Sequence, residues 1–219
     1  YLDFIERGGN LVILGEPRRQ ENMNPLLEPL GLRFTDDMLV RPTREFLADV
    51  MVGYFTDEFG ELSNSIRQAI RQKDCFATLS ACGVEQTEDR GFSVVDCIRT
   101  DSTGVWNERQ TTNFVDEVPT CDPQRGEIEK PYSLMKYLTR EVDGREQRIV
   151  VIGDSDCFAS SELNTTRNGI PATNFSVIQD VFKQMSYGEF PLEHSRVLPH
   201  DDHVRPTQAA NRWPKTHSI

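Results

Sequence analysis

The sequence predicts an α/β domain with a mainly parallel sheet. Two continuous apolar runs, "LVIL" at residues 11–14 and "IVVI" at residues 149–152, each lead directly into a Gly residue. Runs of this kind are typical of strands that are buried on both faces, as the strands of parallel sheets are. The first run is followed by a short helical segment and a further apolar run. This strand–helix–strand unit is the smallest piece of a parallel sheet.

The elements of the first part of the chain follow in order. "YLDFIERGGN" reads as the last turn of a helix, which the two glycines end. After the strand at residues 11–14, "GEP" is an exit turn. "ENMNPLLEPLGLRF" contains a short helix, interrupted by two prolines, and a return strand at residues 32–34. "DMLVRP" is a strand candidate, and the period of "FLADVMVGYFTDE" fits a helix or a strand equally.

The middle of the chain is predicted to contain one helix, two strands and a long irregular connection. "ELSNSIRQAIRQK" is amphipathic, because Leu62, Ile66 and Ile70 are spaced four residues apart. "CFATLSACGVEQ" and "FSVVDCIRT" each contain a strand, and "STGVWNER" is a loop. Residues 111–131 are poor in apolar residues and rich in Asp, Glu and Pro, which predicts an irregular connection.

The last part of the chain contains two further elements and a tail. "YSLMKYLTREVDGREQRIVVIG" is predicted to form a helix or a strand, a turn at Asp143 and Gly144, and the strand at residues 149–152. "NFSVIQDVFKQMSYGEF" is an amphipathic helix whose apolar face is formed by Phe175, Ile178, Phe182 and Met185. We therefore expect one domain at residues 1–190, with an irregular insertion at about 101–131, and an extended tail at residues 191–219.

Composition restricts the function classes. The formal net charge of the 219 residues is -11, which argues against nucleic acid and against a cationic membrane-binding patch. No run reaches the eighteen or so apolar residues of a spanning helix. The chain starts at Tyr1, in what reads as the end of a helix, without a Met or a signal peptide. We expect a processed fragment that begins inside its domain.

Five cysteines carry no metal-binding pattern. None forms a Cys-x-x-Cys pair and no His is near any of them, so a zinc site is not expected. Cys97 and Cys157 stand in strand-like apolar surroundings and are interpreted as buried small hydrophobic residues. A Cys75–Cys82 bridge is an open alternative, and the odd count leaves at least one thiol free or paired between chains.

The segment "IVVIGDSDCFASSELN" offers two carboxylates, Asp154 and Asp156, after a buried strand. It is superficially similar to the phosphoaspartate loop of haloacid-dehalogenase enzymes, which implies a metal-dependent hydrolase or phosphotransferase. It departs from that loop in the intervening Gly153 and in Cys157, which stands at the position of a Thr. The alternative is that both carboxylates accept backbone hydrogen bonds and cap the next helix.

Three other segments have a chemical and a structural interpretation. In "LSACGVE", Cys82 follows a strand as the nucleophile of class I glutamine amidotransferases does, but all four His lie in the tail, so no base is near. "HDDH" at residues 200–203 is a surface metal chelate or a solvated tail segment. Arg18 and Arg19 follow the first strand, where they meet an anion or remain solvated.

Several blocks resemble a known family. "YLDFIERGGNLVILGEPRRQENMNPLLEPLGLRF", "GFSVVDCIRTDSTGVWNE", "EQRIVVIGDSDCFASSEL" and "NFSVIQDVFKQMSYGEFPLEHSR" look like the gliding-motility-associated (Gld-type) auxiliary component of ABC-2-type transporters from Bacteroidetes. The resemblance covers most of the chain. It implies a flavodoxin-like or class I glutamine-amidotransferase-like three-layer α/β fold on the periplasmic face of the inner membrane. It also implies that the first strand or strands are missing and that the tail leads toward a membrane helix. Permease and ATPase subunits would be the partners.

The combined expectation is a non-enzymatic extracytoplasmic domain of an ABC-type transport system that binds a ligand or a partner. The alternatives are the metal-dependent enzyme and a pure protein-interaction scaffold. No cofactor is expected. The possible partners are a small polar ligand or glycan and a second copy of the chain, paired through an exposed sheet edge. The carboxyl ends of parallel strands share one edge, where ligands bind. We therefore expect the site to comprise Glu16, Arg18, Arg19, Asp154, Ser155, Asp156, Ser160 and Asn164.

Overall fold

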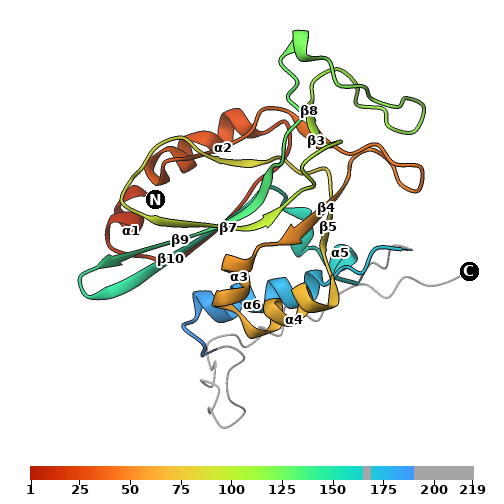
Figure 1. The fold of residues 1–219 in the computed structure, drawn as a ribbon. Helices are drawn as coiled ribbons and strands as arrows, with labels where there is room; N and C mark the ends of the chain where they lie inside the picture. Colours follow the sequence, from red (N-terminus) through yellow and green to blue (C-terminus); the bar gives the residue numbers. More distant parts are fainter. Residues whose placement is uncertain (165–168, 190–219) are drawn as a thin grey trace, which may run out of the picture.

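A six-stranded sheet forms the centre of the molecule. The structure is a computed structural model that describes residues 1–164 and 169–189, so the predicted tail at residues 191–219 lies outside the described part. In the order in which they lie side by side, the strands are β1 (Leu11–Leu14), β10 (Arg145–Ile152), β9 (Ser133–Val142), β7 (Ser93–Arg99), β4 (Val50–Phe55) and β5 (Phe76–Leu79) (Figure 1). β1 runs parallel to β10, and every other neighbouring pair of this sheet is antiparallel.

The predicted fold class is therefore wrong: the chain does not form a mainly parallel, flavodoxin-like three-layer domain. Its sheet is curled and mostly antiparallel. The physical reason lies at Asp143 and Gly144, whose φ angles of 52° and 75° are both positive. Two such residues form the tight turn that joins adjacent antiparallel strands, here β9 and β10, whereas a parallel pair needs a long crossover.

The predicted strand–helix–strand unit has the expected elements but a different pairing. It consists of β1, α2 (Gln20–Leu27), the 3₁₀ turn η1 (Glu28–Leu30) and β2 (Leu32–Phe34). β2 pairs antiparallel with β6 (Val84–Gln86) in a separate two-stranded sheet. β1 is consequently an edge strand, only partly buried, whereas the sequence predicted burial on both faces.

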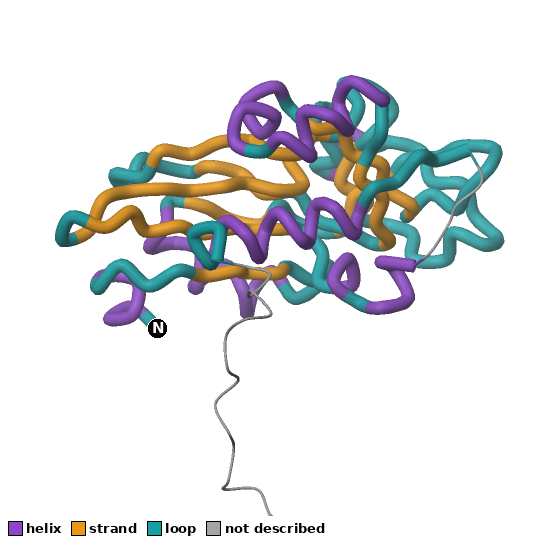
Figure 2. The backbone as a smooth tube through the Cα atoms, turned by 90° about the horizontal axis from the view of Figure 1, so that it is seen from below, coloured by secondary structure: helices purple, strands orange, loops and turns teal. Residues whose placement is uncertain are grey.

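Helices cover both faces of the central sheet (Figures 1 and 2). α1 (Leu2–Glu6) and α2 pack with β2 against one face, and α3 (Asp57–Leu62), α4 (Asn64–Gln72) and α6 (Asn174–Met185) pack against the other. β10 contributes to both cores, because Ile149 and Val151 point to the first and Val150 and Ile152 to the second. The prediction of a strand buried on both faces is thus confirmed for residues 149–152.

The predicted helices are present, with changes in their buried faces. Ser63 divides the first into α3 and α4 and caps α4 by accepting a hydrogen bond from Ile66 N at 3.3 Å, so Leu62 belongs to α3 and is exposed. In α6, Val177, Ile178 and Val181 are buried, whereas Phe175 and Phe182 are 57% and 46% exposed. The predicted apolar face of α6 was therefore only partly right.

The segment predicted as an irregular insertion, about residues 101–131, contains a short strand and a 3₁₀ turn between its loops. β8 (Trp106–Glu108) pairs with β3 (Met38–Val40), and the 3₁₀ turn η2 (Pro123–Arg125) lies further along. Trp106 packs with Val40 and Ala48 in a small apolar cluster, and two buried carboxylates organise the surrounding loop. Glu108 accepts hydrogen bonds from the amides of Gln110 and Thr111, and Glu127 accepts them from those of Arg109 and Asp122.

Among residues 1–164 and 169–189, no helix has the length and apolar character needed to cross a membrane.

Candidate functional site

The structure brings the two predicted loops together at one edge of the sheet. Because β1 and β10 are parallel neighbours, their exit turns lie side by side. Ser155 Oγ donates a hydrogen bond to Glu16 Oε2 at 2.8 Å and so joins the turns directly. After these turns come the 3₁₀ turn η3 (Asp156–Phe158) and α5 (Ser160–Asn164).

Asp154 lies beneath this contact and is sealed from solvent. It is 2% exposed. Its Oδ1 accepts a hydrogen bond from the amide of Asp156 at 2.8 Å, and its Oδ2 accepts one from the hydroxyl of Thr78. Burial raises the pKa of Asp154 to about 7, and the negative charges of Asp156 and Glu16 act in the same direction. Oδ1 therefore stabilises the turn through a backbone hydrogen bond, which is the part of the capping interpretation that holds for Asp154. Oδ2 instead ties the turn to Thr78 on β5, and the 3₁₀ turn η3 that follows has no side-chain cap among the described residues.

The remaining predicted residues are on the surface around this edge. Arg18, Arg19, Asp156 and Ser160 are exposed. The side chain of Asn164 lies outside the described part of the structure. None of the cavities discussed below is lined by these residues.

Cys82 is also sealed. Its side chain is completely buried, and its Sγ donates a hydrogen bond to the carbonyl of Gly153 at 3.1 Å. Burial raises the pKa of the thiol far above its ordinary value, so it is neutral and a poor nucleophile. All five cysteines are free thiols, which excludes the Cys75–Cys82 bridge, and the predicted burial of Cys97 and Cys157 is confirmed. The four His and the "HDDH" segment lie outside the described residues.

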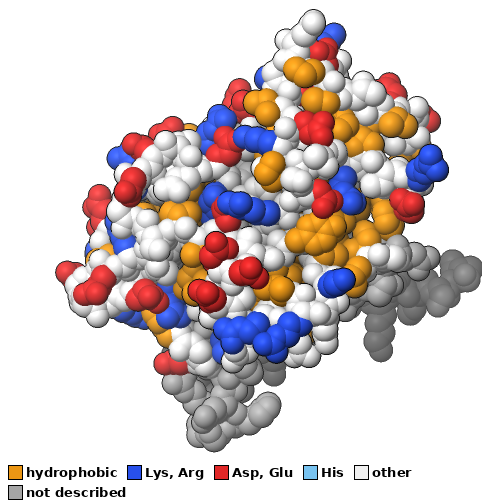
Figure 3. Space-filling model, in the orientation of Figure 1, with side chains coloured by type: hydrophobic (Ala, Val, Ile, Leu, Met, Phe, Trp, Pro, Cys, Tyr) orange, Lys and Arg blue, Asp and Glu red, His pale blue; other side chains and the backbone are white. Residues whose placement is uncertain are grey.

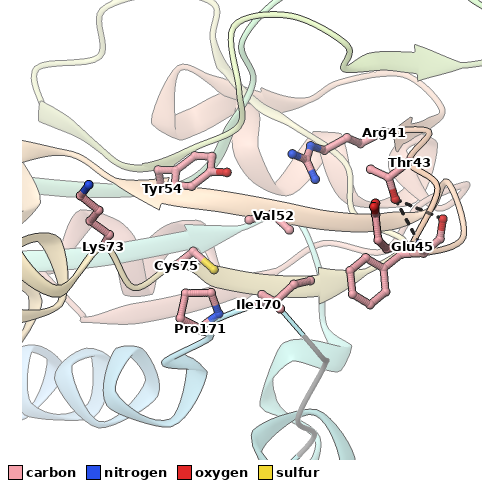
Figure 4. A pocket seen from close by; sticks show the side chains of 11 residues that line it. Arg41, Thr43, Glu45, Val52, Tyr54, Lys73, Cys75, Ile170 and Pro171 are labelled. Atoms are coloured by element: carbon pink, nitrogen blue, oxygen red, sulfur yellow. Dashed lines mark hydrogen bonds between the residues drawn. The ribbon is translucent and has the colours of Figure 1, made fainter.

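A cavity that the sequence did not indicate lies at the other end of the sheet, along β4 and the start of β5 (Figure 4). We call it the β4–β5 pocket, and its volume is about 390 Å³. The loop after β3, the strand β4, the end of α4 and the segment before α6 all contribute to it. It is lined by Arg41, Thr43, Glu45, Phe46, Val52, Tyr54, Lys73, Cys75, Gly169, Ile170 and Pro171.

Two polar side chains of this pocket have fixed partners: Thr43 Oγ1 bonds to the backbone of Phe46 within the lining, and Arg41 bonds to a residue outside it. The guanidinium of Arg41 bonds to Asp101 Oδ2 at 3.0 and 3.1 Å, and Arg41 and the Tyr54 hydroxyl point toward one another across the rim (Figure 4). Burial raises the pKa of Tyr54, and Asp101 adds to this effect while Arg41 opposes it. Burial also raises the pKa of Cys75 on the floor to about 11, so this thiol is neutral.

The lining combines apolar walls with a few polar groups. Val52, Ile170 and Pro171 supply apolar walls, and the ring of Tyr54, which is 42% exposed, supplies an aromatic face with a polar tip. Arg41 supplies hydrogen-bond donors at one side. A concave apolar surface with a few convergent polar groups is the usual form of a small-molecule site.

No known protein family, no curated protein and no solved structure matches this chain. Within the described residues, no group of three or more His, Cys, Asp or Glu side chains is placed to hold a metal ion.

Proposed function

We propose that this chain is a non-enzymatic, extracytoplasmic binding domain of an ABC-type transport system, and that its ligand binds in the β4–β5 pocket. The observation that carries the proposal is a contrast in accessibility. The carboxyl of Asp154 and the thiol of Cys82, the groups best suited to catalysis, are buried and hydrogen-bonded within the fold. The β4–β5 pocket is open and combines apolar walls with polar groups.

The ligand class follows from the lining. A ring-shaped small molecule places an apolar face against Tyr54 and Pro171, and its polar substituents accept hydrogen bonds from Arg41. The transport context rests on the sequence blocks that resemble the auxiliary component of ABC-2-type transporters.

A binding titration tests the pocket. Isothermal calorimetry with p-nitrophenyl β-D-glucopyranoside, a neutral ring-bearing probe, should show saturable binding, and Tyr54→Ala should weaken it by about tenfold through loss of the aromatic contact. Phe175→Ala, which removes an exposed aromatic ring on α6, is the matched control and should leave binding unchanged. Equal weakening by both variants, or no binding by the wild type, would contradict the pocket assignment.

The transport context needs its own measurement. The tagged full-length protein should co-purify from membranes of its source with an ABC ATPase and a permease, identified by mass spectrometry. Recovery without either subunit would count against this part of the proposal, whatever the pocket binds.

A further inference from the structure

A second cavity lies beside the β4–β5 pocket, and its charges are arranged differently. We call it the charged groove; its volume is about 370 Å³, and it lies between β6 on one side and β7 and β9 on the other. Charged side chains dominate its lining. Figure 3 shows Lys and Arg side chains interspersed with Asp and Glu over the face of the molecule in view. The charged lining residues are Glu85, Asp96, Arg99, Lys130 and Lys136.

Each carboxylate of the groove is held by two cations. Glu85 bonds to Lys130 Nζ at 2.5 Å and to Arg33 Nη2 at 2.8 Å. Asp96 bonds to both Lys136 and Arg99. Burial alone would raise the pKa of each carboxyl, but these hydrogen bonds outweigh it and hold both pKa values below the ordinary range. The carboxylates therefore remain ionised at neutral pH.

Positive charge is in excess at this place on an acidic protein. The lining has three cationic and two anionic side chains, whereas the whole chain carries a net charge of -11. The side chain of Lys136 is only 8% exposed, so its charge is poorly screened by water. A partly desolvated cation attracts an oxyanion more strongly than a solvated one does.

A β-bulge in β7 assembles the groove. In the register between β7 and β9, Asp96 faces Lys136 and Ile98 faces Met135, so Cys97 is an extra residue. Cys97 and Ile98 consequently point into the same core. The bulge thereby turns Arg99 to the face that carries Asp96, which strict alternation would forbid. Bulges of this kind commonly re-aim a side chain at a site.

The groove and the β4–β5 pocket meet at one cross-strand pair. Tyr54, which lines the pocket, is the register partner of Arg99, which lines the groove. Directly opposed residues of antiparallel strands project from the same face, with their Cβ atoms about 5 Å apart. Both side chains are exposed. The two cavities therefore open side by side on one face of the sheet.

We propose that the two cavities are subsites of a single site for an elongated ligand, with a ring in the β4–β5 pocket and an oxyanion flanked by hydroxyl groups in the charged groove. This inference rests on the proposed function and specifies its ligand class. The oxyanion accepts hydrogen bonds from Lys136 and Arg99, and the hydroxyls donate to the ionised carboxylates of Glu85 and Asp96. The groove therefore selects acidic, hydroxyl-bearing ligands over neutral ones.

Three probes separate the subsites in calorimetric titrations. p-Nitrophenyl β-D-glucuronide carries a ring and an acidic, hydroxyl-bearing end, p-nitrophenyl β-D-glucopyranoside lacks only the acid, and glucuronate lacks the aromatic ring. The glucuronide should bind about tenfold more tightly than the glucoside, and this gain should shrink as salt is added. p-Nitrophenyl β-D-glucopyranoside 6-phosphate, which keeps the aromatic ring and the sugar hydroxyls, distinguishes a phosphate from a carboxylate as the preferred acid when it is compared with the glucuronide.

Variants assign the gain to the groove. Lys136→Met and Arg99→Gln should each reduce the affinity for the glucuronide toward that for the glucoside, and each should change the affinity for the glucoside by a clearly smaller factor. Arg99→Gln keeps the test available if the buried Lys136 is needed for folding. Arg71→Gln, an exposed cation of α4, is the control and should alter neither affinity.

The outcomes separate this inference from the proposed function. The two-subsite inference is wrong, and the pocket assignment survives, in either of two cases. In the first, the glucoside binds and the glucuronide binds no more tightly than it. In the second, Arg99→Gln leaves the higher affinity for the glucuronide unchanged. If none of the probes binds the wild-type protein, both fail together.

Discussion

Replacing Asp154 with Asn should change how the free energy of unfolding depends on pH. Asp154 is buried, and its pKa is raised from the ordinary 3.8 to about 7. The Asn side chain keeps an acceptor oxygen for the amide of Asp156 and offers an NH₂ group to the hydroxyl of Thr78. The substitution therefore removes the titration while preserving the turn.

The sign and size of the effect follow from proton linkage. Because the folded state holds a proton that the unfolded chain releases near pH 4, the carboxyl stabilises the fold fully below about pH 4. This contribution is lost as the pH rises through about 7. The interval from 3.8 to about 7, at about 1.4 kcal/mol for each pH unit, sets an upper limit of about 4 kcal/mol.

Urea unfolding of the wild-type and Asp154→Asn proteins between about pH 4 and about pH 8 measures this effect. The free energy of unfolding of the wild type, relative to that of the variant, should fall by up to about 4 kcal/mol across the range. Glu61→Gln removes an exposed carboxyl on α3 and serves as the control. Parallel pH profiles for wild type and Asp154→Asn would refute the assignment of a buried, protonated carboxyl.

Three further substitutions test the packing. Gly153→Ala places a Cβ in overlap with the backbone carbonyl oxygen of Cys82. It should lower the free energy of unfolding in urea by about 3 kcal/mol, whereas a loss below about 1 kcal/mol would contradict this close approach. Asn174→Ala leaves the amide and the carbonyl of Ala77, on the edge strand β5, without their side-chain partner; it should lower the free energy of unfolding by about 2–5 kcal/mol and speed amide exchange along β5. Unchanged exchange there would count against the contact. Tyr187→Leu removes a ring on which the guanidinium groups of Arg145 and Arg148 stack. The melting temperature of this variant should be lower than that of the wild type, by an amount equivalent to about 1–2 kcal/mol. An unchanged melting temperature would contradict the stacking.

Local sequence signals identified most elements but not how they pair. The apolar runs at residues 11–14 and 149–152 are strands, and they do pair in parallel. The Asp143–Gly144 turn was visible too, and in this fold it joins two antiparallel strands. The strand before it resembles a helix in period, because both of its faces are buried and alternation is lost. Because β9 was not identified as a strand from its sequence, the parallel pairing of β1 and β10 suggested a parallel sheet.

The candidate site depends on contacts that no local pattern carries. Asp96 and Arg99 are three residues apart, and alternation along a strand assigns them to opposite faces. They share a face only because Cys97 forms a bulge, which depends on pairing with β9. Tyr54 and Arg99 meet through the register of β4 and β7, which is equally non-local. By contrast, the sequence did predict that Glu16 and Ser155 lie together. Their proximity requires only that the strands before them, β1 and β10, pair in parallel.

The measurement that tests the central claim most directly is a titration of the ¹⁵N-labelled protein with p-nitrophenyl β-D-glucuronide, followed by two-dimensional NMR. The account predicts saturable shifts of the amide signals of Tyr54, Arg99 and Lys136, on the face where the β4–β5 pocket and the charged groove meet. The amides of Glu16 and Ser155, at the other sheet edge, should not move. Shifts confined to Glu16 and Ser155, or no saturable shift at the predicted face, would contradict the account.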